Sequence, residues 1–176
     1  VRAEFLTAFM REQRAALAAA GLGRKTSVIV TVPATRAACE FFGLDIPAWV
    51  REGLIDILCP YEFGLNPTPV PLELDFFCET LKGSGLLLLP FINTWASSTE
   101  AILEKAQHYR KWPIDGLSVW DANSFIDRRR WIAYSSLGSD EAIRDALARI
   151  AAGPVHRPLI TYNGVVENRY HYGWNF

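Results

Sequence analysis

The chain has 176 residues, of which 50% are hydrophobic and 21% are charged, so it can bury one sizeable core and is too short to favour two domains. A formal net charge of -1 and a pI near 6.3 exclude the basic field that nucleic-acid-binding proteins present to phosphates. The longest apolar runs reach only about half of the ~20 residues that a membrane-spanning helix needs, so we expect no membrane partner.

The first predicted element is a helix over residues 2–20, where apolar side chains recur at spacings of three and four. Gly21 and Gly23 are expected to end it. The chain opens on Val1 inside this pattern, without the features of a signal peptide, so we expect that its start was processed away or that it is an excerpt. The apolar run 26–33 follows and predicts the first strand.

Residues 34–43 are expected to form a loop or a short helix, and residues 46–52 a short helix with Pro47 at its start. Glu40 and Asp45 follow the first strand, so a role in a cleft is possible for both. Capping of the short helix by Asp45 is the better explanation for that residue.

Three further strands are predicted, and each opens with a Gly-Leu pair. These strands cover residues 53–60, 85–93 and 116–121, and their glycines are 32 and 31 residues apart. Helices predicted over 72–82 and 99–111 fill the intervals, the second with a serine N-cap at 97–98. Strands joined by crossover helices pair in parallel, so the pattern predicts a parallel α/β sheet.

The last part of the chain is less regular. Residues 125–136 carry aromatic side chains and the run Arg128–Arg130, and Ser139 opens a helix predicted to end near Ala152. Gly153 and Pro154 then break the pattern. The final stretch has an Asn163–Gly164 turn between two β-prone arms, which predicts a short β-hairpin.

Two architectures fit four parallel βα units: an open doubly wound sheet, and part of a (β/α)8 barrel, which needs about 250 residues. The first βα turn has no Gly-rich dinucleotide fingerprint, and the strands end in bulky functional groups. Both observations favour a partial TIM barrel. We therefore predict a half barrel over residues 1–152 and a C-terminal β extension over 153–176.

The strand ends supply two carboxylates, Glu62 and Asp121, and hydrolysis of a glycosidic bond needs such a pair. Apolar neighbours would raise the pKa of Glu62, so it is predicted to be the general acid and Asp121 the base or nucleophile. The alternative is that both carboxylates cap loops or accept backbone hydrogen bonds.

Aromatic and amide side chains at the same ends suit a sugar. Tyr61, Trp95 and Trp120 could stack on pyranose rings, and Asn93 could donate to a hydroxyl, although aromatic residues also fill cores and Asn also caps loops. The Arg128–Arg130 run could clamp an acidic sugar, but a solvated helix face explains it better. The three histidines and three cysteines lack metal-ligand spacing, so we predict no metal, disulfide framework or cofactor.

Three segments carry a family resemblance: residues 4–11 (EFLTAFMR), 43–60 (GLDIPAWVREGLIDILCP) and 116–121 (GLSVWD). On the basis of these segments, residues 1 to about 152 resemble bacterial glycosyl-hydrolase-like family 10 proteins. The resemblance implies that the four strands are strands five to eight of a barrel and that the protein lies outside the cytoplasm, periplasmic or secreted. It also implies catalytic glutamates after strands four and seven, but this chain has no strand four, and its strand seven ends without a carboxylate.

Three functions remain open. The first is a fragment of a glycoside hydrolase that acts on a polysaccharide or glycan and is inactive alone. The second is a non-catalytic glycan-binding barrel, and the third an unrelated open α/β domain with its ligand at a switch point of the strand order. A half barrel leaves two sheet edges and an apolar face uncovered, so we expect a homodimer or a missing N-terminal half barrel.

Overall fold

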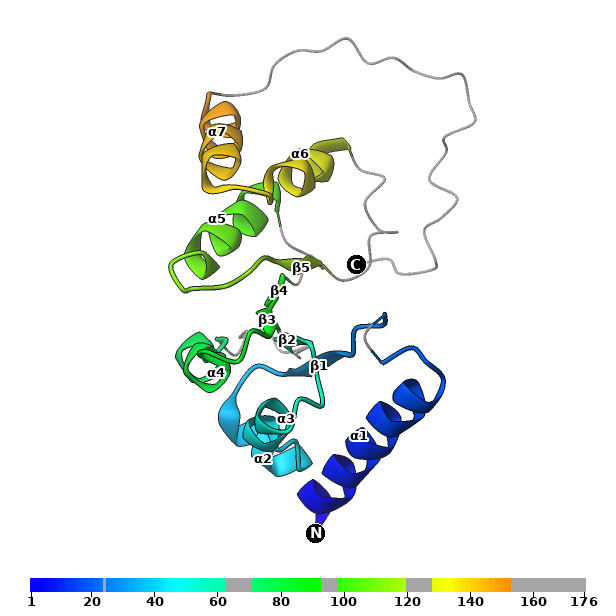
Figure 1. The fold of residues 1–176 in the computed structure, drawn as a ribbon. Helices are drawn as coiled ribbons and strands as arrows, with labels where there is room; N and C mark the ends of the chain where they lie inside the picture. The colour runs from blue at the N-terminus through cyan, green and yellow to red at the C-terminus, as the bar shows by residue number, and fades with distance from the viewer. Residues whose placement is uncertain (24, 63–70, 93–97, 120–127, 153–176) are drawn as a thin grey trace, which may run out of the picture.

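A computed structural model describes residues 1–23, 25–62, 71–92, 98–119 and 128–152, with the side chains of 128–131 excepted (Figure 1). The described elements alternate between helices and short strands along the chain. They are α1 (Arg2–Ala19), β1 (Ile29–Pro33), α2 (Arg36–Phe42), α3 (Ile46–Arg51), β2 (Ile57–Tyr61), α4 (Leu74–Leu81), β3 (Leu87–Leu88), β4 (Phe91–Ile92), α5 (Thr99–Tyr109), β5 (Ser118–Val119), α6 (Arg128–Ser136) and α7 (Asp140–Ala151).

Every strand pairing in the described chain is parallel, which confirms the predicted parallel α/β class. One sheet has the order β1-β2-β3 and a second has the order β4-β5. β3 and β4 are parts of the single strand predicted over 85–93, and Pro90 between them has no N–H to give to a ladder. Hydrogen bonds continue across this break, because Leu89 donates to the Leu58 carbonyl at 2.9 Å and Ser118 to the Pro90 carbonyl at 2.9 Å. The four predicted strands therefore lie side by side in chain order.

The repeated glycines act before the strands rather than as their first residues. Gly53 and Gly85 have φ angles of 65° and 75°, a left-handed conformation that glycine adopts without strain. After Gly53, Leu54 donates to the Trp49 carbonyl at 2.9 Å, which closes the end of α3. The strands begin at Ile57, Leu87 and Ser118, so the predicted starts were too early.

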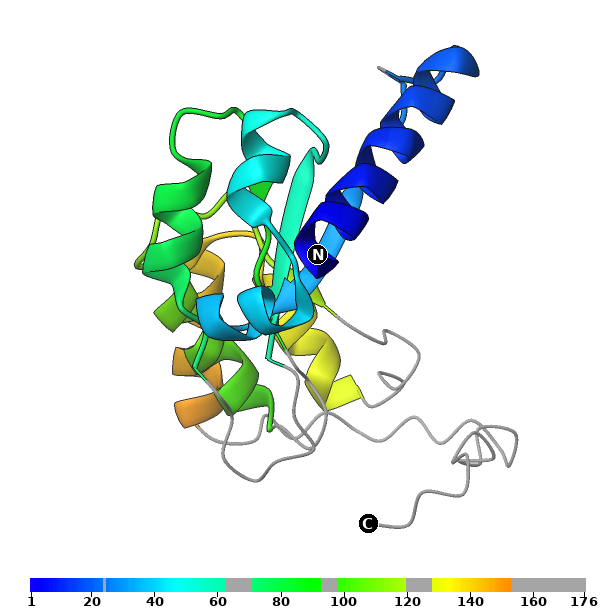
Figure 2. The same ribbon diagram turned by 90° about the horizontal axis from the view of Figure 1, so that it is seen from below.

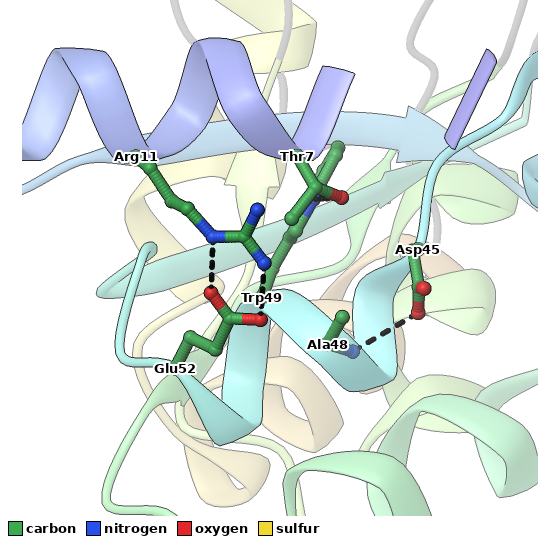
Figure 3. A network of polar contacts seen from close by, with 6 residues as sticks. All are labelled: Thr7, Arg11, Asp45, Ala48, Trp49 and Glu52. Carbon is green, nitrogen blue, oxygen red and sulfur yellow. Dashed lines mark hydrogen bonds and ion pairs between the residues drawn. The ribbon is translucent and has the colours of Figure 1, made fainter. Parts of the chain in front are cut away.

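A helix lies within residues 34–43, where the sequence left a loop or a short helix open. Thr35 caps α2 by accepting from the Ala38 N–H at 3.2 Å, and Asp45 caps α3 by accepting from the Ala48 N–H at 3.0 Å (Figure 3). The capping role predicted for Asp45 is confirmed. Glu40 lies in α2, where its carboxylate pairs with Arg36 at 2.7 Å.

Helix α1 is fixed to α3 by one buried and one exposed polar contact (Figure 3). The indole N–H of Trp49, which is buried, donates to the Thr7 hydroxyl at 3.0 Å. Arg11 makes a bidentate ion pair with Glu52, in which Nε and Nη2 donate to the two carboxylate oxygens at 2.6 and 2.8 Å. A buried indole N–H needs such a partner, so the contact with Thr7 sets where α1 lies on α3.

The core lies on one face of the strands. Val32, Leu58 and Leu88 come from β1, β2 and β3 and are buried against α1–α4. Ile92 of β4 belongs to a second cluster with α5, α6 and α7. In Figure 2 the cyan and green helices accordingly stand on one side of the strands.

Residues alternate along each strand, so a second set points away from those helices. Ile29, Ile57 and Leu87 are in register across β1, β2 and β3, and Ile29 and Leu87 are 59% and 42% exposed. We call this side the open face, and it also carries Thr31, Cys59, Leu89 and Phe91. It is an apolar sheet surface that the described elements leave partly uncovered.

Two serine caps confirm the predicted helix starts. Ser98 accepts from the Ala101 N–H at 3.1 Å at the start of α5, and Ser139 accepts from the Ala142 N–H at 3.1 Å at the start of α7. None of the described helices is both long enough and apolar enough to cross a bilayer. The hairpin predicted within 153–176 lies outside the described residues.

Candidate functional site

The carboxyl ends of the parallel strands are the expected place for a site, because these ends meet at one edge of the sheet. Tyr61 and Glu62, at the end of β2, are the predicted site residues that the structure describes. Asn93, Trp95, Trp120 and Asp121 lie outside the described residues, as does the side chain of each arginine in the 128–130 run. The geometry of the predicted site can therefore be described for Tyr61 and Glu62, at the end of β2.

Tyr61 is the last residue of β2 and lies on the open face. Its ring meets that of Phe91 edge-on, with centroids 5.4 Å apart and an interplanar angle of 81°. Burial raises the pKa of the Tyr61 hydroxyl, and the negative charge of Glu62 raises it further. Two adjoining strands thus place aromatic rings together near their carboxyl ends.

Glu62 points in the opposite direction, toward α5. Its side chain is buried, with the residue only 7% exposed. One carboxylate oxygen accepts from the Tyr109 hydroxyl at 2.5 Å and the other accepts from the Lys105 ammonium group. Both oxygens have a partner, so the Glu62 side chain is fixed on the helix side of the sheet.

The residues Glu62, Lys105 and Tyr109 form what we call the α5 anchor. Burial raises the pKa of Tyr109 strongly, and the hydrogen bond to Glu62 and the Glu62 charge act in the same direction. The sequence did not reveal this cluster, because Lys105 and Tyr109 are 43 and 47 positions from Glu62. Their spacing of four, which places both on one face of the 99–111 helix, was the available signal.

Cys59 and Ser118 are a second pair that the sequence did not bring together. Burial raises the pKa of the Cys59 thiol, and a side-chain hydrogen bond with Ser118 lowers it by a smaller amount. Cys59 is in β2 and Ser118 is in β5, and the strand formed by β3 and β4 lies between them. The effect of Ser118 on the pKa of the Cys59 thiol therefore acts across an intervening strand.

The opposite, amino-terminal ends of the strands carry two aspartates in equivalent roles. Asp56 accepts from the Val28 N–H at 2.6 Å, and Asp115 accepts from the Leu88 N–H at 2.8 Å. Arg14 of α1 joins Asp56 with a 2.6 Å ion pair. Asp56 precedes β2 and binds the backbone just before β1, and Asp115 precedes β5 and binds the backbone of β3. Each carboxylate therefore links its own strand to the neighbouring strand that comes earlier in the chain.

A groove of about 450 Å³ lies on the helix side, lined by residues of α1–α4. Its charged lining groups already have partners: Arg36 pairs with Glu40, and Asp45 caps α3. Burial raises the pKa of the Cys39 thiol beside it to about 11, so this thiol stays protonated near neutral pH. The groove offers neither a reactive thiolate nor convergent polar groups.

Within the described ranges, no group of three or more His, Cys, Asp and Glu side chains could hold a metal ion. Cys39, Cys59 and Cys78 are free thiols, the first two buried. Fold and site together define an α/β protein of parallel strands with aromatic rings at the strand ends. No model of a known protein family matches the chain, and the search of curated proteins found no match.

Proposed function

We propose that this chain forms half of a glycoside-hydrolase-like (β/α)8 barrel that acts on a polysaccharide or glycan at the carboxyl ends of its strands. The observation that carries the proposal is that the described strands follow one another in parallel and in chain order, while the helices that pack on Val32, Leu58 and Leu88 cover one face. Strands joined in this order by right-handed crossovers place their helices on one side, as in a (β/α)8 barrel. The effect of Ser118 on the pKa of the Cys59 thiol supports curvature of the sheet. In a flat sheet, strands that are two positions apart lie about 9.6 Å from each other. Small side chains can meet over that span only where the sheet curves, with the open face concave.

Other features of the strands support the same architecture. The interior of an eight-stranded parallel barrel is filled by layers of branched side chains that come from alternate strands. The open face carries such side chains in register, with Ile29, Ile57 and Leu87 in one row. All the described helices that pack on Val32, Leu58 and Leu88 do so from the other face, as the outer helices of a barrel do.

The substrate proposal depends on the strand ends. Tyr61 and Phe91 form an aromatic pair there, and aromatic faces bind the C–H groups of sugar rings. We assign sugar contacts to Tyr61, Asn93, Trp95 and Trp120, and the base or nucleophile role to Asp121. Because both oxygens of Glu62 are engaged by α5, we propose that Glu62 acts as an acid only if Lys105 and Tyr109 release it during turnover.

A non-catalytic glycan-binding barrel is the second candidate, and the α5 anchor favours it. A carboxylate that is ion-paired and buried on the helix side stabilises the fold without reaching the sugar. In this case the aromatic side chains bind the glycan and no bond is broken.

The proposal predicts that Trp95→Ala and Trp120→Ala each weaken saccharide binding at least about tenfold, because each removes a stacking surface. Calorimetric titration with soluble oligosaccharides of several linkages measures the affinity. Trp112→Ala is the matched control, since this indole N–H bonds Asp75 on the helix side at 2.8 Å and its loss should leave affinity unchanged.

Release of reducing sugar from the same oligosaccharides, measured on the complete barrel of which this chain forms half, separates the two candidates. An enzyme loses turnover with Asp121→Ala and keeps its affinity, whereas the binding module releases no sugar in any variant. If the wild-type chain bound none of the saccharides at millimolar concentration, the carbohydrate proposal would be wrong.

A further inference from the structure

β1 is the end strand of the first sheet among the described residues, and it lacks the usual protection of an edge. Sheet edges are normally blunted by charged side chains, bulges or a covering element. The residues of β1 are Ile29, Val30, Thr31, Val32 and Pro33, and no charge is among them. Only the proline at the end of the strand would hinder a further pairing.

Helix α1 lies at the same end of the molecule as β1 (Figure 1), and some of its apolar side chains are exposed. Its sequence has two apolar stripes rather than one. Leu6 and Met10 pack into the core, whereas Phe5 and Phe9 are 74% and 48% exposed. Exposed aromatic side chains that lie one helical turn apart indicate an interaction surface.

We propose that two copies of this chain associate about a two-fold axis parallel to the strands, with β1 of each copy pairing in parallel with β5 of the other. This inference rests on the proposed half-barrel architecture. The four strand positions of one copy and the four of the other give eight, the number at which a parallel sheet closes around its own side chains. A two-fold axis along the strands keeps every pairing parallel and leaves no edge open.

The same arrangement accounts for both apolar surfaces. The open faces of the two copies become the interior, so Ile29 and Leu87 lose their contact with water. In this arrangement the exposed Phe5 and Phe9 of α1 contact the last helices of the other copy. The carboxyl ends of all eight strands then meet at one end of the barrel, which completes the carbohydrate site.

Sedimentation of the wild-type chain over a range of concentrations tests the proposal. We expect a discrete dimer of the 19.8 kDa chain, with a monomer only at high dilution. Ile29→Asp and Leu87→Asp should each raise the dimer dissociation constant at least about 30-fold, because each places a charge in the interior. Phe41→Asp is the matched control, since Phe41 is exposed on α2 away from the open face and its loss should leave the dimer intact.

Far-UV circular dichroism shows whether each variant is folded, and the wild-type result decides the question even if the variants unfold. A wild-type monomer at 100 times the lowest concentration used, or open-ended aggregates without a dimer, would overturn the proposal. So would a dimer that both folded aspartate variants leave unchanged. A monomer that binds saccharide refutes the dimer alone, whereas a dimer that binds none refutes the carbohydrate function alone.

Discussion

Glu62→Ala is expected to lower the free energy of unfolding by about 3 kcal/mol, at the low end of the cost of breaking a buried ion pair. The substitution leaves the Lys105 ammonium group and the Tyr109 hydroxyl facing a space that no carboxylate fills. Lys105 is partly exposed, so water recovers some of its loss, while Tyr109 is buried and recovers little. Urea denaturation followed by circular dichroism measures the change.

The control for this prediction is Glu79→Ala. Glu79 pairs with Lys82 at 3.4 Å where both side chains are exposed, so its loss should hardly change the urea midpoint. Equal losses for the two variants would show that the Glu62 carboxylate is not held by α5.

The pH dependence of stability gives a second readout of the same cluster. The folded protein raises the pKa of Tyr109 above its ordinary value of 10.0, so the folded state keeps a proton that the unfolded state releases. Stability from this group is therefore complete below about pH 10 and is lost as the pH rises through the folded pKa. Tyr109→Phe, which cannot ionise, should flatten this alkaline loss.

Leu58→Ala is expected to destabilise the protein by about 2–5 kcal/mol, the usual cost of removing a buried leucine side chain. Leu58 lies in β2, between β1 and β3, and its side chain is fully buried with those of Val32, Leu88 and Phe77. Truncation leaves a cavity between the strands and the helices that cover them.

Leu22→Ala makes the same chemical change at an exposed position and should cost less than about 0.5 kcal/mol. The two midpoints in urea are compared under identical conditions. If both variants unfolded at the same midpoint, Leu58 would not lie in the core, and the assignment of the helix-covered face would be wrong.

Much of the fold was predictable because local sequence decides it. The Gly-Leu interval correctly indicated parallel strands with crossover helices, and Asp45 and Ser139 are the expected caps. The starts of the strands were not predictable from that interval, because Gly53 and Gly85 serve left-handed turns that precede each strand. Periodicity predicted the helix over residues 2–20, but it cannot tell which of the apolar side chains of α1 are buried and which are exposed.

The site was less predictable, because its contacts join distant positions. The sequence placed Glu62 correctly at the end of a strand, and apolar neighbours suggested a free general acid. A one-residue step along a strand changes the face to which a side chain points, so Tyr61 lies on the open face and Glu62 meets α5. Its partners Lys105 and Tyr109 could be found only once the helix had been placed beside the strand.

The curvature of the sheet is the central claim, and a disulfide tests it most directly. Ser118→Cys places a second thiol in β5, two strand positions from Cys59 in β2, and a disulfide between them needs β-carbons only about 3.5–4.5 Å apart. The folded variant is oxidised with diamide and digested, and its cross-linked peptides are identified by mass spectrometry, with Cys59→Ala in the same background as the control. We expect a disulfide between residues 59 and 118 that is absent from the control. Free thiols at both positions under conditions that oxidise exposed cysteines would show that the sheet is too flat to belong to a barrel.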